Sequence, residues 1–113
     1  TWIFDITDET NPIPVSSWQA EDLDPIGEPQ GIFTGCHQPS EVVTGPVIPF
    51  AWFSKGIRML DISNPHAPRE VGHFDPDPQP GCDRICANDI TVDDRGLIYV
   101  IDRLRGLHIV EQT

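Results

Sequence analysis

A short segment of this chain is repeated with an unchanged internal spacing. Residues 2–7 are Trp-Ile-Phe-Asp-Ile-Thr and residues 58–63 are Arg-Met-Leu-Asp-Ile-Ser, and in each copy a proline follows the aspartate by seven residues. A valine follows that proline by three residues, and an aromatic residue follows it by six. Gly106 begins a third copy, which matches the segment that begins at Gly56. Repeats of this kind predict an array of small units, each of which buries its apolar face against a neighbour.

The spacing between the copies locates an insertion. Asp61 follows Asp5 by 56 residues, whereas Glu111 follows Asp61 by 50 residues. Segments 36–56 and 86–106 align without a gap, so the six extra residues lie in the connector 19–35. This connector is rich in proline and acidic residues, which is typical of a solvated loop that carries an insertion.

The apolar runs within a unit are short and rich in β-branched and aromatic residues. Residues 89–92, 97–101 and 107–110 are separated by turn residues and each predicts a strand, and residues 70–74 predict a fourth strand. No stretch has helical periodicity over two turns. Four antiparallel strands in about 40 to 50 residues are typical of one β-propeller blade. The sequence therefore predicts an all-β fold.

The order of the strands predicts an incomplete β-propeller. Residues 1–18 predict the third and fourth strands of one blade, residues 36–74 a full four-stranded blade, and residues 87–113 the first three strands of the last blade. Residues 19–35 and 75–86 are the connecting loops. Because a propeller needs at least about four blades to close, we expect a partner chain to complete the ring. The expected partner is the upstream chain of the same precursor, which would supply two strands beside Thr1 and one beside residues 106–111.

The repeated motif resembles that of a known family. Residues 56–68 and 106–111 follow the pattern Gly-Leu-x-Ile-Val-(Asp/Glu), then Ile-Ser-(Asp/Asn)-Pro-x-x-Pro, which is similar to the LVIVD-repeat β-propellers. The resemblance covers nearly the whole chain outside residues 19–35. It implies a propeller fold and a protein that is secreted or surface-attached, in a family whose members are often of unassigned function. Propellers of neighbouring families, such as the methanethiol oxidases, hold a metal through histidines near the central channel, which is an analogy of fold alone.

Composition excludes some partners. Eighteen acidic and seven basic residues give a net charge of −11, which repels phosphate backbones, so we expect no nucleic-acid partner. The acidity fits simple solubility, and it also fits a preference for cationic substrates or metal ions. No transmembrane segment or signal peptide is present, so we expect no membrane insertion.

The cysteines leave the cellular compartment open. The sequence has three cysteines, and Cys36 can pair with Cys82 or Cys86 if their Cα atoms approach within about 7 Å. Such a disulfide would favour a secreted or periplasmic protein.

One candidate site lies at the predicted channel mouth. His37 lies in the segment 36–38, and Asn88 and Asp89 lie in the equivalent segment 86–89 of the next blade, at the start of the innermost strand. Because the innermost strands converge on the axis, His37 is a candidate ligand for a divalent metal ion, with Asn88 or Asp89 as oxygen donors. The alternative is that these side chains hydrogen-bond to loop backbone. The recurring residues Asp5, Asp61 and Glu111 lie at turns, where Asx-type hydrogen bonds explain them.

A second candidate is Thr1. An amino-terminal threonine that precursor cleavage exposes can use its hydroxyl as nucleophile and its α-amine as base. The leading hypothesis is therefore a hydrolase of small amides or esters, which acts through Thr1 and in which His37, Asn88 and Asp89 shape a polar or metal-binding pocket. Limited proteolysis or an arbitrary division of the chain also explains a terminal threonine. The alternative functions are a non-catalytic binding or surface propeller and a metal-dependent oxidase.

Overall fold

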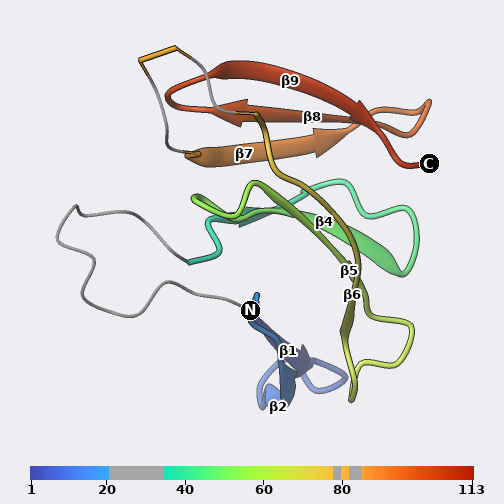
Figure 1. Ribbon diagram of the computed structural model, residues 1–113. Coiled ribbons are helices and arrows are strands. Elements are labelled where there is room, and N and C mark those ends of the chain that lie inside the picture. Colours follow the sequence, from blue (N-terminus) through green and yellow to red (C-terminus); the bar gives the residue numbers. More distant parts are fainter. Residues whose placement is uncertain (21–34, 78–79, 82–84) are drawn as a thin grey trace, which may run out of the picture.

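The computed structural model describes residues 1–20, 35–77, 80–81 and 85–113. These residues form nine β-strands in three antiparallel sheets and contain no helix (Figure 1). Accordingly, the described residues include no helix long and apolar enough to cross a membrane. The all-β class that the short β-branched runs predict is confirmed.

The first sheet has two strands, β1 (Trp2–Asp5) and β2 (Ile13–Ser17). Aspartate side chains hold the turn between them, since Asp5 accepts hydrogen bonds from the backbone N–H and the hydroxyl of Thr7 at 2.8 and 2.6 Å. In the equivalent turn of the next sheet, Asp61 accepts a hydrogen bond from the N–H of Ser63 at 2.9 Å. The recurring aspartates therefore fold the turns between the last two strands of a unit.

The second sheet has four strands, in the order β3 (Gln38–Pro39), β4 (Val47–Ala51), β5 (Ile57–Asp61) and β6 (Arg69–Phe74). The turn between β4 and β5 requires glycine at position 56. Gly56 has a φ of 61°, and a Cβ atom there would collide with the backbone oxygen of Phe74. The glycine therefore lets β6 run close to the start of β5.

The third sheet has three strands, in the order β7 (Ala87–Val92), β8 (Leu97–Asp102) and β9 (Gly106–Glu111). Asp102 is 2% exposed and ties two parts of this sheet together. One carboxylate oxygen accepts a hydrogen bond from the N–H of Cys86 at 2.7 Å, and the other accepts from the N–H groups of Leu104 and Arg105 at 2.7 and 3.1 Å. This aspartate thereby joins the β8–β9 turn to the start of β7.

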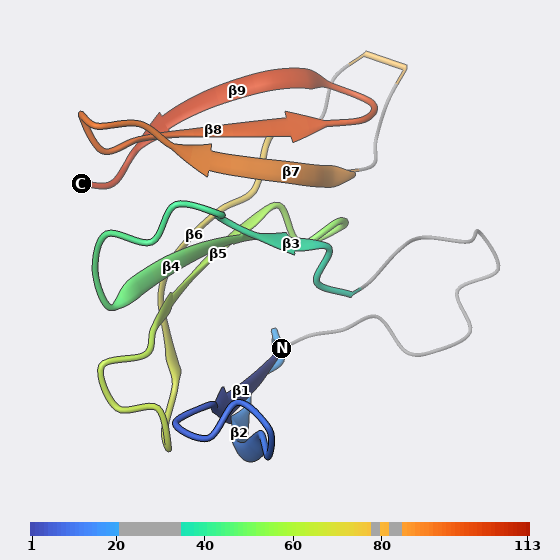
Figure 2. The same ribbon diagram turned by 180° about the vertical axis from the view of Figure 1, so that it is seen from behind.

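The four-stranded sheet lies between the other two in both views (Figures 1 and 2). Its junction with the three-stranded sheet is a continuous apolar cluster of Ala51, Ile57, Met59, Ala87, Ile90, Ile98 and Val100. A backbone hydrogen bond from the N–H of Ala87 to the oxygen of Phe53, at 3.0 Å, also crosses this junction. The junction with the two-stranded sheet contains a second cluster around Phe50, Trp52 and Leu60, on which Trp18 packs.

The two longer copies of the repeat fold in the same register. Val47 pairs with Asp61 and Ala51 with Ile57, and fifty residues later Leu97 pairs with Glu111 and Ile101 with Leu107. The gapless alignment is therefore also a structural equivalence over residues 47–61 and 97–111. Since side chains alternate between faces, equivalent residues of these two ranges lie on equivalent faces of their sheets. The innermost strands differ by one residue, because Gln38 pairs with Ala51 whereas Asp89, and not Asn88, pairs with Ile101.

Some predictions fall on residues outside the described ranges. The predicted insertion loop, residues 19–35, is described only at residues 19–20 and 35, and the loop 75–86 lacks residues 78–79 and 82–84. Cys82, one possible disulfide partner, is therefore outside the description. Cys36 carries a free thiol in this structure, so no disulfide joins it to Cys86.

Candidate functional site

Thr1 lies at the junction between the two-stranded and four-stranded sheets. Its amino group donates a hydrogen bond to the oxygen of Trp18 at 3.0 Å, and the N–H of Trp18 donates to the oxygen of Thr1 at the same distance. These bonds extend the β1–β2 ladder by one residue pair. The Thr1 hydroxyl oxygen is buried and makes no hydrogen bond of ordinary geometry to another described atom.

A cavity of about 610 Å³ opens beside Thr1. Its lining is mostly apolar and includes Cys36, Ile48, Phe50 and Leu60. Burial raises the pKa of the Cys36 thiol, and the neighbouring Thr1 side chain and the amino-terminal charge oppose this rise. The polar side chains at the cavity are therefore those of Thr1, Cys36 and Ser40, in otherwise apolar surroundings.

His37 lies at the other junction, next to the three-stranded sheet. Its backbone N–H donates to the oxygen of Ala51 at 2.9 Å, and its ring contacts the ring of Phe53 edge-on at a centroid distance of 4.8 Å. Because the backbone of Phe53 is hydrogen-bonded to Ala87, the imidazole is positioned beside the start of β7. The side chain is exposed.

Asn88 and Asp89, at the start of β7, differ in their strand pairing and hydrogen bonds. The pairing of β7 with β8 is irregular between Ala87 and Asp89, which leaves Asn88 unpaired, and the buried Asn88 Oδ1 atom has no hydrogen-bond partner among the described residues. Asp89 pairs with Ile101, and its Oδ1 atom accepts a hydrogen bond from the N–H of Ile90 at 2.8 Å. This register places Asp89 on the face that the four-stranded sheet does not cover.

The predicted site residues thus do not come together: Thr1 and His37 lie at different junctions, and Asp89 lies on the outer face of the three-stranded sheet. The cavity beside Thr1 is not lined by His37, Asn88 or Asp89. The described residues contain no group of three or more His, Cys, Asp or Glu side chains that could hold a metal ion. Any metal at His37 would need ligands from outside these residues.

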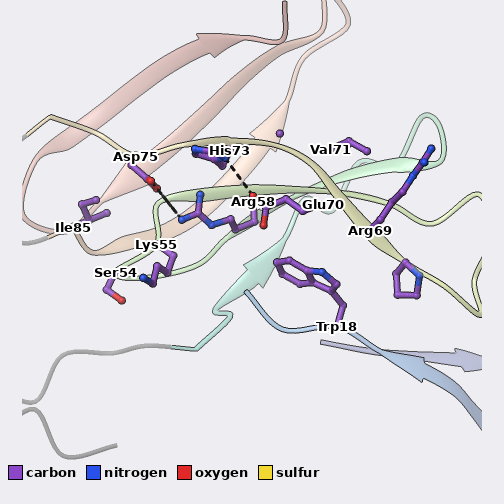
Figure 3. A pocket seen from close by; sticks show the side chains of 12 residues that line it. Trp18, Ser54, Lys55, Arg58, Arg69, Glu70, Val71, His73, Asp75 and Ile85 are labelled. Atoms are coloured by element: carbon purple, nitrogen blue, oxygen red, sulfur yellow. Dashed lines mark hydrogen bonds and ion pairs between the residues drawn. The ribbon is translucent and has the colours of Figure 1, made fainter. Parts of the chain in front are cut away.

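A larger groove of about 1020 Å³ runs along β6 and ends near Trp18 (Figure 3). Its arginines are already paired with carboxylates, because Arg58 lies 3.1 Å from Asp75 and Arg69 lies 3.0 Å from Asp61. The pairing of Arg58 leaves little free positive charge in the middle of the groove, where the figure shows its guanidinium pointing at Asp75. The groove is therefore polar but has no concentrated charge with which to recognise an ion.

An exposed apolar surface covers the outer face of the three-stranded sheet, which faces away from the four-stranded sheet. It consists of Tyr99, Ile101, Leu107 and Ile109, which pair across β8 and β9 as Tyr99 with Ile109 and Ile101 with Leu107. Ile101, Leu107 and Ile109 are 51%, 58% and 55% exposed. Adjacent exposed aliphatic side chains on one face of a sheet are typical of a protein interaction surface.

Sequence reasoning missed two features of these sites. Cys36 was expected only as a disulfide or channel residue, and its position beside Thr1 depends on two sheets whose packing no sequence pattern encodes. The role of Asp102 in holding the β8–β9 turn was also missed, although a polar residue that ends a buried strand was a usable signal.

Comparison of the chain with protein-family models, with curated proteins and with solved structures finds no match. The assignment of a function therefore depends on the geometry of the chain itself.

Proposed function

We propose that this chain is a non-catalytic interaction module: one sector of an LVIVD-like β-propeller that binds a further β-sheet of the same repeat through the outer face of its three-stranded sheet. The supporting observation is that equivalent positions in two copies of the repeat differ in how much of the side chain is exposed. Ile57 and Met59 are 1% and 7% exposed because the three-stranded sheet covers them, whereas their repeat equivalents Leu107 and Ile109 are 58% and 55% exposed.

The contrast extends across the whole face. Val47, Pro49 and Ala51 of β4 are half-buried or buried, and their equivalents in β8 are Leu97, Tyr99 and Ile101. The outer face thus keeps the apolar character of a face that is covered in the preceding unit. Covering the exposed 58% of Leu107 and 55% of Ile109 would contribute roughly 0.8–1.7 kcal/mol for each side chain.

The partner surface can be described from the junction that is present. The three-stranded sheet covers Ile57 and Met59 with small and β-branched side chains, namely Ala87, Ile90, Ile98 and Val100. A partner for the outer face should present the same kind of side chains from its first two strands. We propose that the partner is the upstream chain of the same precursor, which carries further copies of the repeat.

The test is a pair of aspartate substitutions on the outer face. Leu107→Asp with Ile109→Asp should release the chain from its assembly, as measured by size-exclusion chromatography with light scattering and by native mass spectrometry. Leu104→Asp is the matched control, because Leu104 is an equally exposed leucine (53%) in the β8–β9 turn, outside the strands. Either a wild-type protein that is monomeric, or a double variant that keeps the assembly of the wild type, would refute the proposal.

A hydrolase centred on Thr1 is the second candidate function. It is favoured by the buried Thr1 hydroxyl, which lies beside the 610 Å³ cavity and makes no hydrogen bond of ordinary geometry, in a residue whose own amine can act as base. In this proposal the cavity binds the apolar part of a small amide or ester, and His37, Asn88 and Asp89 take no direct part.

The hydrolase proposal has its own test. Intact-mass and amino-terminal analysis should show Thr1 as a defined terminus, and hydrolysis of p-nitrophenyl esters and anilides should be abolished in Thr1→Ala but retained in Thr1→Ser. A different mature terminus, or equal turnover in the alanine variant, would exclude Thr1 as the nucleophile.

A further inference from the structure

The outer edge of β9 has no neighbouring strand in the described part of the chain. The three-stranded sheet ends at β9, whereas the equivalent strand β5 is followed by β6 and the equivalent strand β1 by β2. An exposed strand edge presents unpaired N–H and C=O groups to any chain that can pair with them. The edge of β9 is therefore a second binding surface, distinct from the outer face.

We propose that the edge of β9 binds an antiparallel strand with the pattern Pro-x-x-Val-small-x-aromatic, supplied by the partner chain. This inference rests on the proposed function, since it describes the strand by which the partner would complete the last sheet. The pattern comes from the two fourth strands that the structure contains, residues 12–18 and 68–74.

The valine of the pattern occupies a β-bulge. In the two-stranded sheet Ile3 pairs with Ser16 and Phe4 with Pro14, so that Val15 is the extra residue. In the four-stranded sheet Met59 pairs with Gly72 and Leu60 with Glu70, so that Val71 is the extra residue. The bulge has the same place in both sheets. Without the extra residue, every side chain after it would point to the opposite face.

The residue after the bulge is small because of the side chain opposite. A Cβ atom built on Gly72 would lie 3.6 and 3.8 Å from the Cγ and Cβ atoms of Met59, which is ordinary contact. A serine fits this space, as at Ser16, but a longer side chain would overlap with the methionine. On β9 the position of Met59 is taken by Ile109, whose branched side chain restricts the opposite residue in the same way.

The aromatic residue of the pattern forms the last residue pair at the other end of the ladder. Phe74 pairs with Ile57, and Trp18 exchanges two backbone hydrogen bonds with Thr1, the residue equivalent to Ile57. The incoming strand should therefore place an aromatic side chain opposite Leu107. A basic residue at the start of the strand would pair with Glu111 as Arg69 pairs with Asp61 at 3.0 Å, but this exposed pair adds little energy.

The experiment uses peptides copied from this chain. A peptide of residues 67–75 is titrated against the 113-residue chain, and amide hydrogen exchange of residues 106–111 is measured by mass spectrometry. We expect at least about tenfold slower exchange in β9 at saturating peptide, since outward-pointing amides gain hydrogen-bond partners. Two control peptides test the pattern: one lacks Val71, and the other carries Gly72→Leu. Each should bind at least about tenfold more weakly.

Three outcomes would overturn the inference: no protection of β9, protection of another segment instead, or equal binding of the three peptides. These outcomes are separable from a failure of the proposed function. If the assembly depends on Leu107 and Ile109 but the peptide without Val71 binds as well as the parent peptide, the face is an interface and only the edge pattern is wrong. If a second copy of this chain occupied the edge of β9, the protein would form dimers that the parent peptide dissociates. That result would also overturn the assignment of the strand to a partner chain.

Discussion

Replacing Asp102 by alanine should destabilise the three-stranded sheet more than any surface change. The carboxylate is 2% exposed and accepts hydrogen bonds from Cys86, Leu104 and Arg105. Removing the acceptor of a buried N–H group lowers the free energy of unfolding by about 1–3 kcal/mol. Leu104 is exposed, so water can reach the turn and replace part of what the carboxylate provides there, whereas the N–H of Cys86 at the start of β7 would lose its acceptor. The total cost should be about 2–4 kcal/mol.

Asparagine at this position should be intermediate. Its amide oxygen can still accept from Leu104 and Arg105, but its NH₂ group would face the N–H of Cys86, so that one donor stays unsatisfied at about 1–3 kcal/mol. Asp94→Ala is the matched control, because Asp94 is exposed in the β7–β8 turn and its loss should change the free energy of unfolding by no more than about 0.5 kcal/mol.

The assay is equilibrium urea unfolding of the purified protein, combined with hydrogen exchange of the three-stranded sheet. The midpoint should fall in the order Asp94→Ala, Asp102→Asn, Asp102→Ala, with an unchanged dependence of the free energy on urea. An Asp102→Ala variant that unfolds at the same urea concentration as the Asp94→Ala control would refute the role assigned to the carboxylate.

Three further predictions concern single residues. Hydrogen bonds from the side chain and backbone of Ser63, and then from Arg69, lower the pKa of Asp61 from 3.8 to about 2, so its carboxylate stabilises the fold above pH 3.8 and this contribution is lost as the pH falls through about 2. The difference in thermal midpoint between the wild type and Asp61→Asn should shrink steadily as the pH falls from 3.8 through about 2, and a constant difference would contradict it. Gly56→Ala should cost more than about 2 kcal/mol in urea unfolding because of the collision with β6, whereas Gly96→Ala, which meets nothing within 4 Å, should cost only about 1 kcal/mol; equal costs would be inconsistent with the turn geometry. Burial raises the pKa of the Cys36 thiol, so peptide mapping after iodoacetamide treatment at pH 8 should show alkylation at least about tenfold slower in the folded than in the unfolded protein, and equal rates would show that the thiol is accessible.

Much of the fold could be predicted because the strands are short, β-branched and repeated. The predicted strand 97–101 is observed as Leu97–Asp102, and the predicted strand 107–110 as Gly106–Glu111. The gapless alignment gives the register of β8 and β9 once that of β4 and β5 is known, since a shift of one residue would move apolar side chains to the wrong face.

The bulges could not be predicted in the same way. Val15 and Val71 fit an ordinary alternating strand as well as a bulge, and only the observed pairing shows that each is an extra residue.

The candidate site was harder to predict than the fold. Equivalence between blades places segments 36–38 and 86–89 at the starts of two adjacent innermost strands, but it says nothing about which residues of different sheets face one another. Thr1 and Cys36 are neighbours because the two-stranded sheet packs on the four-stranded sheet at a particular distance, which depends on the sum of many side-chain volumes. Asp89 was expected to face a pocket, and the irregular pairing after Ala87 places it beside Ile101 instead.

The two junctions differ in how tightly they are filled, and this difference sets the order in which the sheets separate. One is a closed cluster crossed by the Ala87 to Phe53 hydrogen bond, whereas the other borders the open cavity of about 610 Å³. Local unfolding is easiest where fewer apolar contacts are buried, so the hairpin of β1 and β2 should detach while the remaining sheets stay together. The two larger sheets therefore form one cooperative unit, to which the hairpin is more loosely attached.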